Sequence, residues 1–276
     1  MKARKMPSLF PCLILLSAIF LYGSGCSKME RPIIIAHRGS SFTAPENTLA
    51  AALLAWEQNA DAVEVDVYLT TDKKIVCLHD ETTKRTTGVD LEIAESSWDQ
   101  VKDLDAGSWK SPEYKGEPIP LLTSVIDSIP PGKTLYVEIK AGEEIVPYLT
   151  KVIEASGKRD QIIIICFDFD TLKAAHEAMP GIPVMWLFCE KKDQETGKRP
   201  PLQISRIERA RAAGFDAMDV CYHCVDPGVA AACKARGLGI YIWTVDDPVE
   251  AERQFKMGVQ GVTTNKPDLM LEHFAR

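Results

Sequence analysis

The chain has 276 residues, which is enough for one large α/β domain or two small ones. Its apolar fraction is that of an ordinary globular protein, so the chain can bury a full hydrophobic core. The formal net charge of −7 argues against a nucleic-acid-binding protein, which would carry a basic patch or stripe. The charge does not argue against a phosphate-containing ligand, because a few local Arg and Lys side chains decide that.

Residues 1–26 predict an export signal. A basic start precedes an apolar run over 9–22 that is short for a membrane span, and small residues then lead to Cys26. The ending resembles a bacterial lipobox, although Gly23 stands where Leu is usual; the alternative is an ordinary signal peptide with a chance cysteine. We therefore expect cleavage before Cys26, lipidation of that cysteine, and an exported cell-envelope lipoprotein whose folded domain spans 31–276.

Six cysteines remain once Cys12 has left with the signal and Cys26 is set aside. Disulfides are possible among them in an exported protein. Cys221 and Cys224 form a Cys-x-x-Cys motif, but the sequence has no second pair at zinc-finger spacing and no thioredoxin-like context. We interpret the pair as structural.

The stretch 33–39 predicts a buried parallel strand that ends at a functional site. A short apolar run stops at His37, Arg38 and Gly39, which supply a proton carrier, an anion clamp and a flexible residue. That combination suits the carboxyl ends of barrel strands, where the active sites of α/β barrels lie. Taken alone, the stretch fits equally well a strand end whose His and Arg are merely solvated. A helix is expected next, over 49–58.

The second predicted strand, 62–69, alternates along its length. Glu64 and Asp66 lie two residues apart and share one side, while valines take the other side. Two carboxylates that face into a barrel are unfavourable unless they are paired or bind a metal ion. The alternative, an edge strand with a solvated face, fits poorly so soon after a buried strand.

The segment 70–74 is too short to link two parallel strands, which need about a dozen residues. Residues 75–78 should therefore return as the antiparallel arm of a hairpin and bring His79 and Asp80 to the barrel mouth, near His37. Histidine titrates near neutral pH, so a facing pair can act as acid and base together.

Residues 81–120 interrupt the βα rhythm and are predicted to form an insertion. We expect a polar loop over 82–88, a short helix or turn over 98–105, and a further loop over 114–120. A long segment directly after a catalytic histidine is typical of a lid or a specificity element.

The regular alternation then resumes. Strands are expected over 135–140, 161–166, 183–187, 217–220, 239–244 and 261–264. Helices are expected over 122–129, 145–155, 172–178 with Asp170 as its cap, 204–213, 227–236, 247–256, and from Pro267 onward. Without the hairpin return this gives eight strands, which predicts an α/β fold, a (β/α)8 TIM barrel with a small insertion after the second-strand hairpin. A doubly wound open sheet would need a Gly-rich turn after the first strand, and the sequence has none there.

Charged side chains gather at the predicted strand ends. Three carboxylates without a cysteine ligand point to one hard divalent cation, Ca²⁺ or Mg²⁺, and two basic residues would balance an anion beside it. Two histidines, a hard metal and two cations together describe phosphodiester chemistry. The residues concerned are His37, Arg38, Glu64, Asp66, His79, Glu138, Lys140 and Trp243.

The motifs, taken in order, resemble those of the glycerophosphodiester phosphodiesterase family over about residues 33–270. Two positions depart from the family pattern, Gln260 and Asn265, each of which often holds Asp. We expect these departures to affect local packing more than chemistry. The motifs are His37-Arg38-Gly39, Pro45-Glu46-Asn47-Thr48, Glu64-Val65-Asp66, His79-Asp80, Glu138-Ile139-Lys140, Trp243-Thr244 and 261–267.

The resemblance implies a TIM barrel that hydrolyses glycerophosphodiesters to glycerol 3-phosphate and an alcohol through a cyclic phosphate. It also implies a role for each matched residue. Two alternatives stay open, a phospholipase-type enzyme that acts on intact or lyso-lipids and a non-catalytic, lipid-anchored binding protein. The implied roles are metal binding by Glu64, Asp66 and Glu138, acid–base catalysis by His37 and His79, phosphate or substrate binding by Arg38, Lys140 and Trp243, and support of the metal or of His37 by Glu46.

Overall fold

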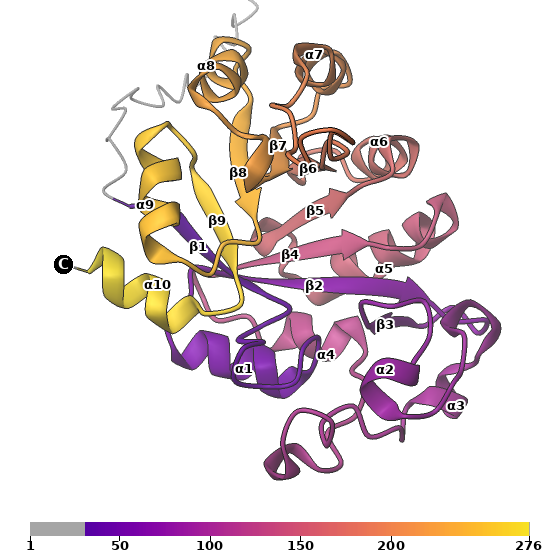
Figure 1. The fold of residues 1–276 in the computed structure, drawn as a ribbon. Coiled ribbons are helices and arrows are strands. Elements are labelled where there is room, and N and C mark those ends of the chain that lie inside the picture. Colours follow the sequence, from indigo (N-terminus) through magenta and orange to yellow (C-terminus); the bar gives the residue numbers. More distant parts are fainter. Residues whose placement is uncertain (1–30, 276) are drawn as a thin grey trace, which may run out of the picture. The chain divides into compact units, whose positions relative to one another are not determined.

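The computed structural model describes residues 31–275, which fold around one nine-stranded sheet. Strand β1 pairs in parallel with both β2 and β9, so the sheet closes into a barrel, and β3 alone runs antiparallel, against β2 (Figure 1). The predicted TIM barrel is therefore confirmed. The strands are β1 (Ile33–His37), β2 (Ala62–Leu69), β3 (Ile75–Cys77), β4 (Thr134–Ile139), β5 (Ile162–Cys166), β6 (Val184–Phe188), β7 (Ala217–Cys221), β8 (Gly239–Trp243) and β9 (Gly261–Thr264).

Helices on the outside of the barrel cover the strands. Several begin at side chains that accept the first free N–H groups of the helix, as Thr48 does for α1 and Asp168 for α6. Asp170 lies in the first turn of α6, so the cap predicted at Asp170 was placed two residues too late. The helices are α1 (Leu49–Glu57), α2 (Lys84–Thr87), α3 (Trp98–Val101), α4 (Leu122–Asp127), α5 (Val146–Ser156), α6 (Phe169–Ala178), α7 (Ile204–Ala212), α8 (Pro227–Ala235), α9 (Pro248–Lys256) and α10 (Pro267–Phe274).

Alternation along the strands separates two apolar layers. In β2 the side chains of Val63, Val65 and Val67 are fully buried in the large cluster that the helices cover. A smaller cluster fills the barrel interior and includes Ile35, Tyr136 and further inward-facing residues. Glu64 and Asp66 alternate with the valines along β2, so their side chains point into the barrel, above the smaller cluster, as the pattern predicted.

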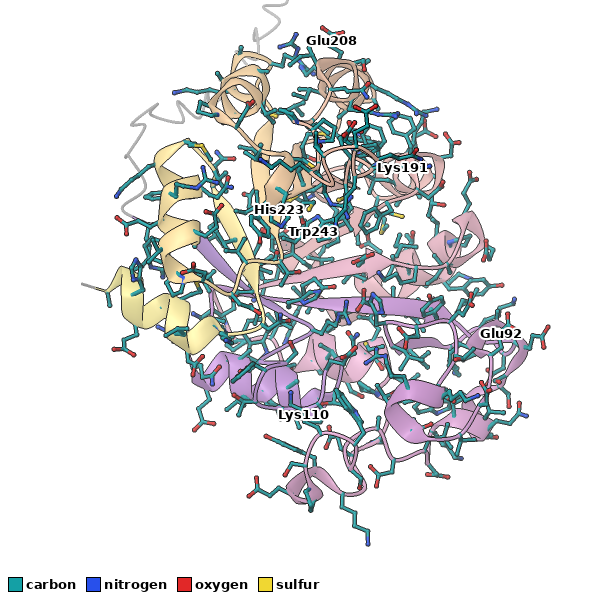
Figure 2. The ribbon with its side chains drawn as sticks, viewed as in Figure 1. Glu92, Lys110, Lys191, Glu208, His223 and Trp243 are labelled. Atoms are coloured by element: carbon teal, nitrogen blue, oxygen red, sulfur yellow. The ribbon has the colours of Figure 1, made fainter. Side chains whose placement is uncertain are left out.

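The segment between β3 and α4 builds a small core of its own. The buried cluster comprises Val76, Leu78, Ile93, Val101, Ala106 and Ile119. Lys110, labelled in Figure 2, ties the segment back to the barrel because its Nζ donates to the carbonyl oxygen of Ser41 at 2.7 Å. The insertion thus packs as a folded unit beside the barrel mouth.

One prediction within the insertion was wrong. Residues expected as polar loop contain the single turn α2, which ends at Gly88 in the left-handed conformation, with φ of 76°. The composition gave no helical periodicity over so short a stretch. Tertiary contacts hold the turn instead: Thr86 is buried, and Arg85 is paired with acidic residues outside the helix.

No helix within 31–275 is both long and apolar enough to cross a membrane. The predicted signal and the predicted lipidation site at Cys26 lie outside the described residues.

Candidate active site

A tight turn directly after β1 brings backbone and side chain to the barrel mouth. Arg38 has a φ of 57° and Gly39 a φ of 80°. A Cβ atom on Gly39 would lie 2.5 Å from the carbonyl carbon of Ala51, so only glycine fits against α1. The turn aims the Arg38 N–H at Glu64, where it donates to Oε2 at 2.9 Å.

A pocket opens where the strands end. It collects seven of the predicted site residues from four strands and the hairpin. Asp66 lies fully buried beside them, and Glu46 lies behind Arg38. The seven residues that line the pocket are His37, Arg38, Glu64, His79, Glu138, Lys140 and Trp243.

Three carboxylates meet at one side of this pocket. Glu64, Asp66 and Glu138 each bring an oxygen to within 4.8 Å of the oxygens of the other two. Glu64 Oε1, Asp66 Oδ1 and Glu138 Oε1 are all buried; within the described residues Glu64 Oε1 has no partner, and the other two each face Nζ of Lys140. Three buried acidic oxygens that meet in one place fit the ligand set of a hard divalent cation.

The charges of the three acids are unequal. Burial would raise the pKa of Asp66, but Lys140 and Arg38 together hold it below its ordinary value. Burial and then the charge of Asp66 raise the pKa of Glu138 to about 8, and the same two causes raise the pKa of Glu64 strongly. Without a cation the cluster keeps protons, and a bound cation would displace them.

Two basic side chains lie against the same acids. Lys140 Nζ is 3.1 Å from Asp66 Oδ1 and 2.5 Å from Glu138 Oε1. Arg38 Nε is 3.2 Å from Asp66 Oδ2. Both bases line the pocket, so each is placed to meet an anionic ligand there as well.

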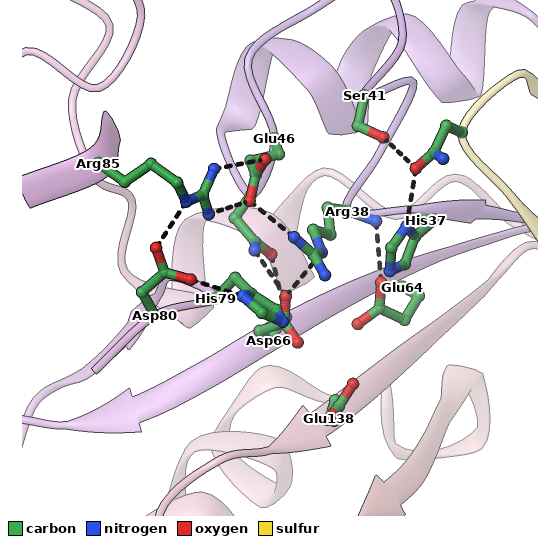
Figure 3. A network of polar contacts seen from close by, with 12 residues as sticks. His37, Arg38, Ser41, Glu46, Glu64, Asp66, His79, Asp80, Arg85 and Glu138 are labelled. Carbon is green, nitrogen blue, oxygen red and sulfur yellow. Dashed lines mark hydrogen bonds and ion pairs between the residues drawn. The ribbon is translucent and has the colours of Figure 1, made fainter. Parts of the chain in front are cut away.

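The turn before α1 holds both the acid cluster and Arg38. Asn47 donates from Nδ2 to Asp66 Oδ2 at 2.8 Å and accepts from the Asp66 N–H at 3.0 Å. Glu46 was expected to support the metal or His37. Its hydrogen bonds in the described chain go instead to Arg38 Nη1 at 2.8 Å and to Arg85, so it positions the guanidinium of Arg38. Figure 3 shows these links.

His37 contacts Asn265, a residue that was expected to affect local packing more than chemistry. His37 Nδ1 lies 2.7 Å from Asn265 Oδ1, and Asp246 accepts from the Asn265 backbone N–H and from Nδ2, each at 2.8 Å. Because the Asp246 carboxylate accepts only, the Asn265 amide must turn its oxygen to His37. His37 therefore carries its proton on Nδ1 and presents the Nε2 lone pair.

His79 has a different partner. Its Nδ1 lies 2.7 Å from Asp80 Oδ1, and Arg85 from the insertion donates to Asp80 Oδ2 at 2.6 Å (Figure 3). The hydrogen bond from Arg85 lowers the pKa of Asp80 to about 2, so a full carboxylate faces the imidazole. His37 differs, since burial and then the charge of Arg38 lower its pKa to about 4.

The far wall of the pocket is mostly apolar and carries one carboxyl group that the sequence analysis missed. Asp219 on β7 is 1% exposed and lines the pocket, and its Oδ1 accepts no hydrogen bond in the described chain. Burial raises its pKa to about 7. The sequence could have indicated this position: residues alternate between the two faces of a strand, so Asp219 faces the barrel interior together with Ala217.

Trp243 closes this wall. Its Nε1 donates to the carbonyl oxygen of Asp219 at 3.2 Å, and its ring meets Phe167 edge-on, with centroids 5.4 Å apart. Ile165 and Leu187 line the same side.

Comparison with known proteins identifies the family. The model of the glycerophosphoryl diester phosphodiesterase family matches residues 37–269. A glycerophosphodiester phosphodiesterase of Caldanaerobacter subterraneus is 32% identical over 247 residues, which is 87% of this chain and 97% of that protein. A solved phosphodiesterase of Oleispira antarctica, in complex with the product sn-glycerol-3-phosphate, is 28% identical with a TM-score of 0.80, over 89% of this chain and 98% of that one. The chain belongs to the glycerophosphoryl diester phosphodiesterase family.

Proposed function

We propose that the protein hydrolyses glycerophosphodiesters to glycerol 3-phosphate and an alcohol, with one divalent cation and two histidines. The observation that carries the proposal is the set of three buried carboxylate oxygens, all within 4.8 Å of one another, beside two histidines in different surroundings. Membership of the family supports the activity, and the complex of the Oleispira protein supports the glycerol phosphate part of the substrate.

Glu64, Asp66 and Glu138 would hold the cation, Ca²⁺ or Mg²⁺, which supplies positive charge that acidifies a neighbouring hydroxyl group and neutralises a phosphoryl oxygen. Lys140 and Arg38 present their remaining N–H donors to the phosphate from the same side of the pocket. Charge that builds on the phosphoryl oxygens during the reaction is therefore stabilised by donors that are already in place.

The two histidines divide the proton transfers. His37 is neutral above about pH 4, and its Nδ1 proton is committed to Asn265, so Nε2 can take the proton of the attacking glycerol hydroxyl group. Asp80 contacts His79 Nδ1 at 2.7 Å and so orients the ring, which leaves Nε2 free to donate a proton to the leaving alcohol. Attack by the glycerol hydroxyl group gives a cyclic phosphate, which water then opens with the two roles exchanged.

The apolar wall orients the substrate. Trp243 and Phe167 offer ring surface to the carbon chain of the glycerol. Among the described residues that line the pocket, Asp219 is the carboxyl group on that wall, and its Oδ1 has no partner, so it hydrogen-bonds a glycerol hydroxyl group that does not react.

A substrate panel tests the proposal. The full chain is freed of metal and assayed with Ca²⁺ or Mg²⁺ on glycerophosphodiesters of several alcohols and on a lysophospholipid. We expect metal-dependent release of glycerol 3-phosphate from the glycerophosphodiesters. Faster turnover of the lysophospholipid would favour the phospholipase alternative, and binding of all substrates without turnover would favour the non-catalytic one. His223→Gln, which changes an exposed histidine outside the pocket lining, is the matched control.

We also propose that the chain is exported and anchored to a membrane through a lipid on Cys26. The support is the basic, apolar and small-residue order of positions 1–26. Cells that express the chain should incorporate labelled fatty acid into it and hold it in the membrane fraction. Cys26→Ala should abolish the label and release active enzyme, and a label that persists in this variant would contradict the proposal.

A further inference from the structure

Three cysteines converge away from the acidic residues of the active site. The sulfur atoms of Cys189, Cys221 and Cys224 all lie within 4.8 Å of one another. The sequence motif gave only Cys221 and Cys224. Cys189 joins them because it directly follows β6, and β6 pairs with β7, whose last residue is Cys221.

The backbone holds the three sulfurs in place. Cys224 ends a 3-10 turn over Tyr222–Cys224, and its carbonyl oxygen accepts from the Leu202 N–H at 2.9 Å. The fully buried Gln254 donates from Nε2 to the Tyr222 carbonyl oxygen at 3.1 Å. Two of the cysteines are buried and Cys189 is half-buried, so the cluster lies near the surface at Cys189.

We propose that Cys189, Cys221 and Cys224 bind one thiophilic cation of the Zn²⁺ class as thiolates. Thiolate sulfur selects such ions, whereas the carboxylates of the active site select hard cations, so the two sites take different metals. Around an ion with Zn–S bonds of about 2.3 Å, sulfurs are about 3.8 Å apart, and the three sulfurs here already lie within 4.8 Å of one another.

Charge and proton balance fit this ion. Three thiols lose three protons as one Zn²⁺ binds, which leaves a net charge of −1 on the complex. Arg199 is the basic residue that acts on Cys189 and Cys224, and it donates to the Glu190 carbonyl oxygen beside them. Its positive charge offsets the net charge of the complex.

A fourth ligand can come from solvent or from the backbone. The Glu190 carbonyl oxygen lies 3.7 Å from Cys189 Sγ. His223 follows Cys221 by two residues, but it is exposed and its ring stacks on Tyr222 with centroids 3.9 Å apart. We assign the fourth position to water or to the Glu190 carbonyl oxygen.

A disulfide explains the arrangement less well. A disulfide uses two sulfurs at about 2.05 Å and leaves the third without a partner. A metal ion uses all three sulfurs and displaces their protons itself.

Cadmium absorption tests the proposal. The full chain is reduced, stripped of metal, kept in excess Mg²⁺ to fill the oxygen site, and titrated with Cd²⁺, whose thiolate complexes absorb in the ultraviolet. We expect a thiolate band that saturates at one Cd²⁺ per chain with release of about three protons. Zn²⁺ should abolish the band by competition and raise the melting temperature.

Cys189→Ser and Cys233→Ser form the matched pair. Cys189 is half-buried, so its replacement should fold, lose most of the band and keep the phosphodiesterase activity. Cys233 is a fully buried thiol on α8 outside the cluster, and its replacement should leave the band unchanged. The proposal is overturned if the reduced chain shows no thiolate band, if both variants lose it equally, or if mass spectrometry finds a cluster disulfide that re-forms in the presence of Zn²⁺.

Discussion

The two sides of the barrel mouth differ in chemistry. Strands β1, β2 and β4, with the hairpin, contribute the two histidines, the three acids and both cations, whereas β5 to β9 contribute mainly apolar surface and one carboxyl group. On the charged side most polar groups are paired with one another, as His37 is with Asn265 and Asp66 is with Asn47, although the buried Glu64 Oε1 has no partner among the described residues. On the apolar side Asp219 Oδ1 has no partner among those residues either. Neighbouring polar groups therefore fix the geometry of the charged side, whereas Asp219 is a single carboxyl group on an apolar wall.

The largest expected effect comes from removing one acid of the charged side. Glu64→Gln should lower kcat/KM by on the order of 10³ and weaken cation binding, because the neutral amide is a poor ligand for a hard ion. The fold should survive with an equal or higher melting temperature, since burial already disfavours the Glu64 carboxylate.

The exposed acid Glu57 provides the control for this prediction. Glu57→Gln on α1 should retain activity and cation affinity. Equal activity of Glu64→Gln and Glu57→Gln would remove Glu64 from the reaction. Calorimetric titration with Mg²⁺ and Ca²⁺ reports the binding directly.

A second, smaller effect should follow from loosening His37. Asn265→Ala should lower kcat by about 10- to 100-fold with little change in KM, because the imidazole loses the acceptor that fixes its proton on Nδ1. The pH profile sharpens the test. In the parent, activity should fall as the pH drops through about 4, where His37 gains its second proton.

Asn265→Asp should move that acidic limb to higher pH, because a carboxylate on Nδ1 stabilises the imidazolium and raises the pKa of His37. An unmoved limb would show that His37 is not the base. If the Asn265 variants show only a lower Tm and keep the pH profile of the parent, then Asn265 has a structural role alone.

The smallest effect concerns the apolar side. Asp219→Ala should lower kcat/KM on a glycerophosphodiester by about 10-fold, because the variant loses one hydrogen bond to the substrate in a buried pocket. The matching substrate has propanediol in place of glycerol and lacks the distal hydroxyl group. On that substrate, parent and variant should be equal. A 10-fold loss on both substrates would mean that Asp219 supports the barrel and does not contact the substrate.

Sequence patterns predicted the barrel because each element carried its own signal. The apolar run of β1 and the alternation of β2 each specify a strand and a face without knowledge of the neighbours. The short turn α2 carried no such signal, because contacts of Arg85 and Thr86 stabilise it from outside.

The site was predictable where the motif residues act directly and less so where they act through others. Asn265 touches His37 across 228 positions of the sequence, and no local pattern encodes such a pair. The support that Glu46 gives to the metal or to His37 stays a prediction; its motif did not indicate that Arg38 and Arg85 would both donate to it. Cys189 likewise lies far in sequence from its two partner thiols.

The division of labour between the two histidines is tested most directly by changing the leaving group. Both His37→Ala and His79→Ala should lower kcat by about 10²–10⁴ on glycerophosphocholine, whose alcohol needs a proton to leave. On a glycerol phosphodiester of 4-nitrophenol, which leaves as an anion, His79→Ala should regain most of the parent rate of 4-nitrophenolate release in a single turnover, and His37→Ala should stay slow. Rescue of His37→Ala, or equal losses by both variants on both substrates, would contradict the assignment of His37 as base and His79 as acid.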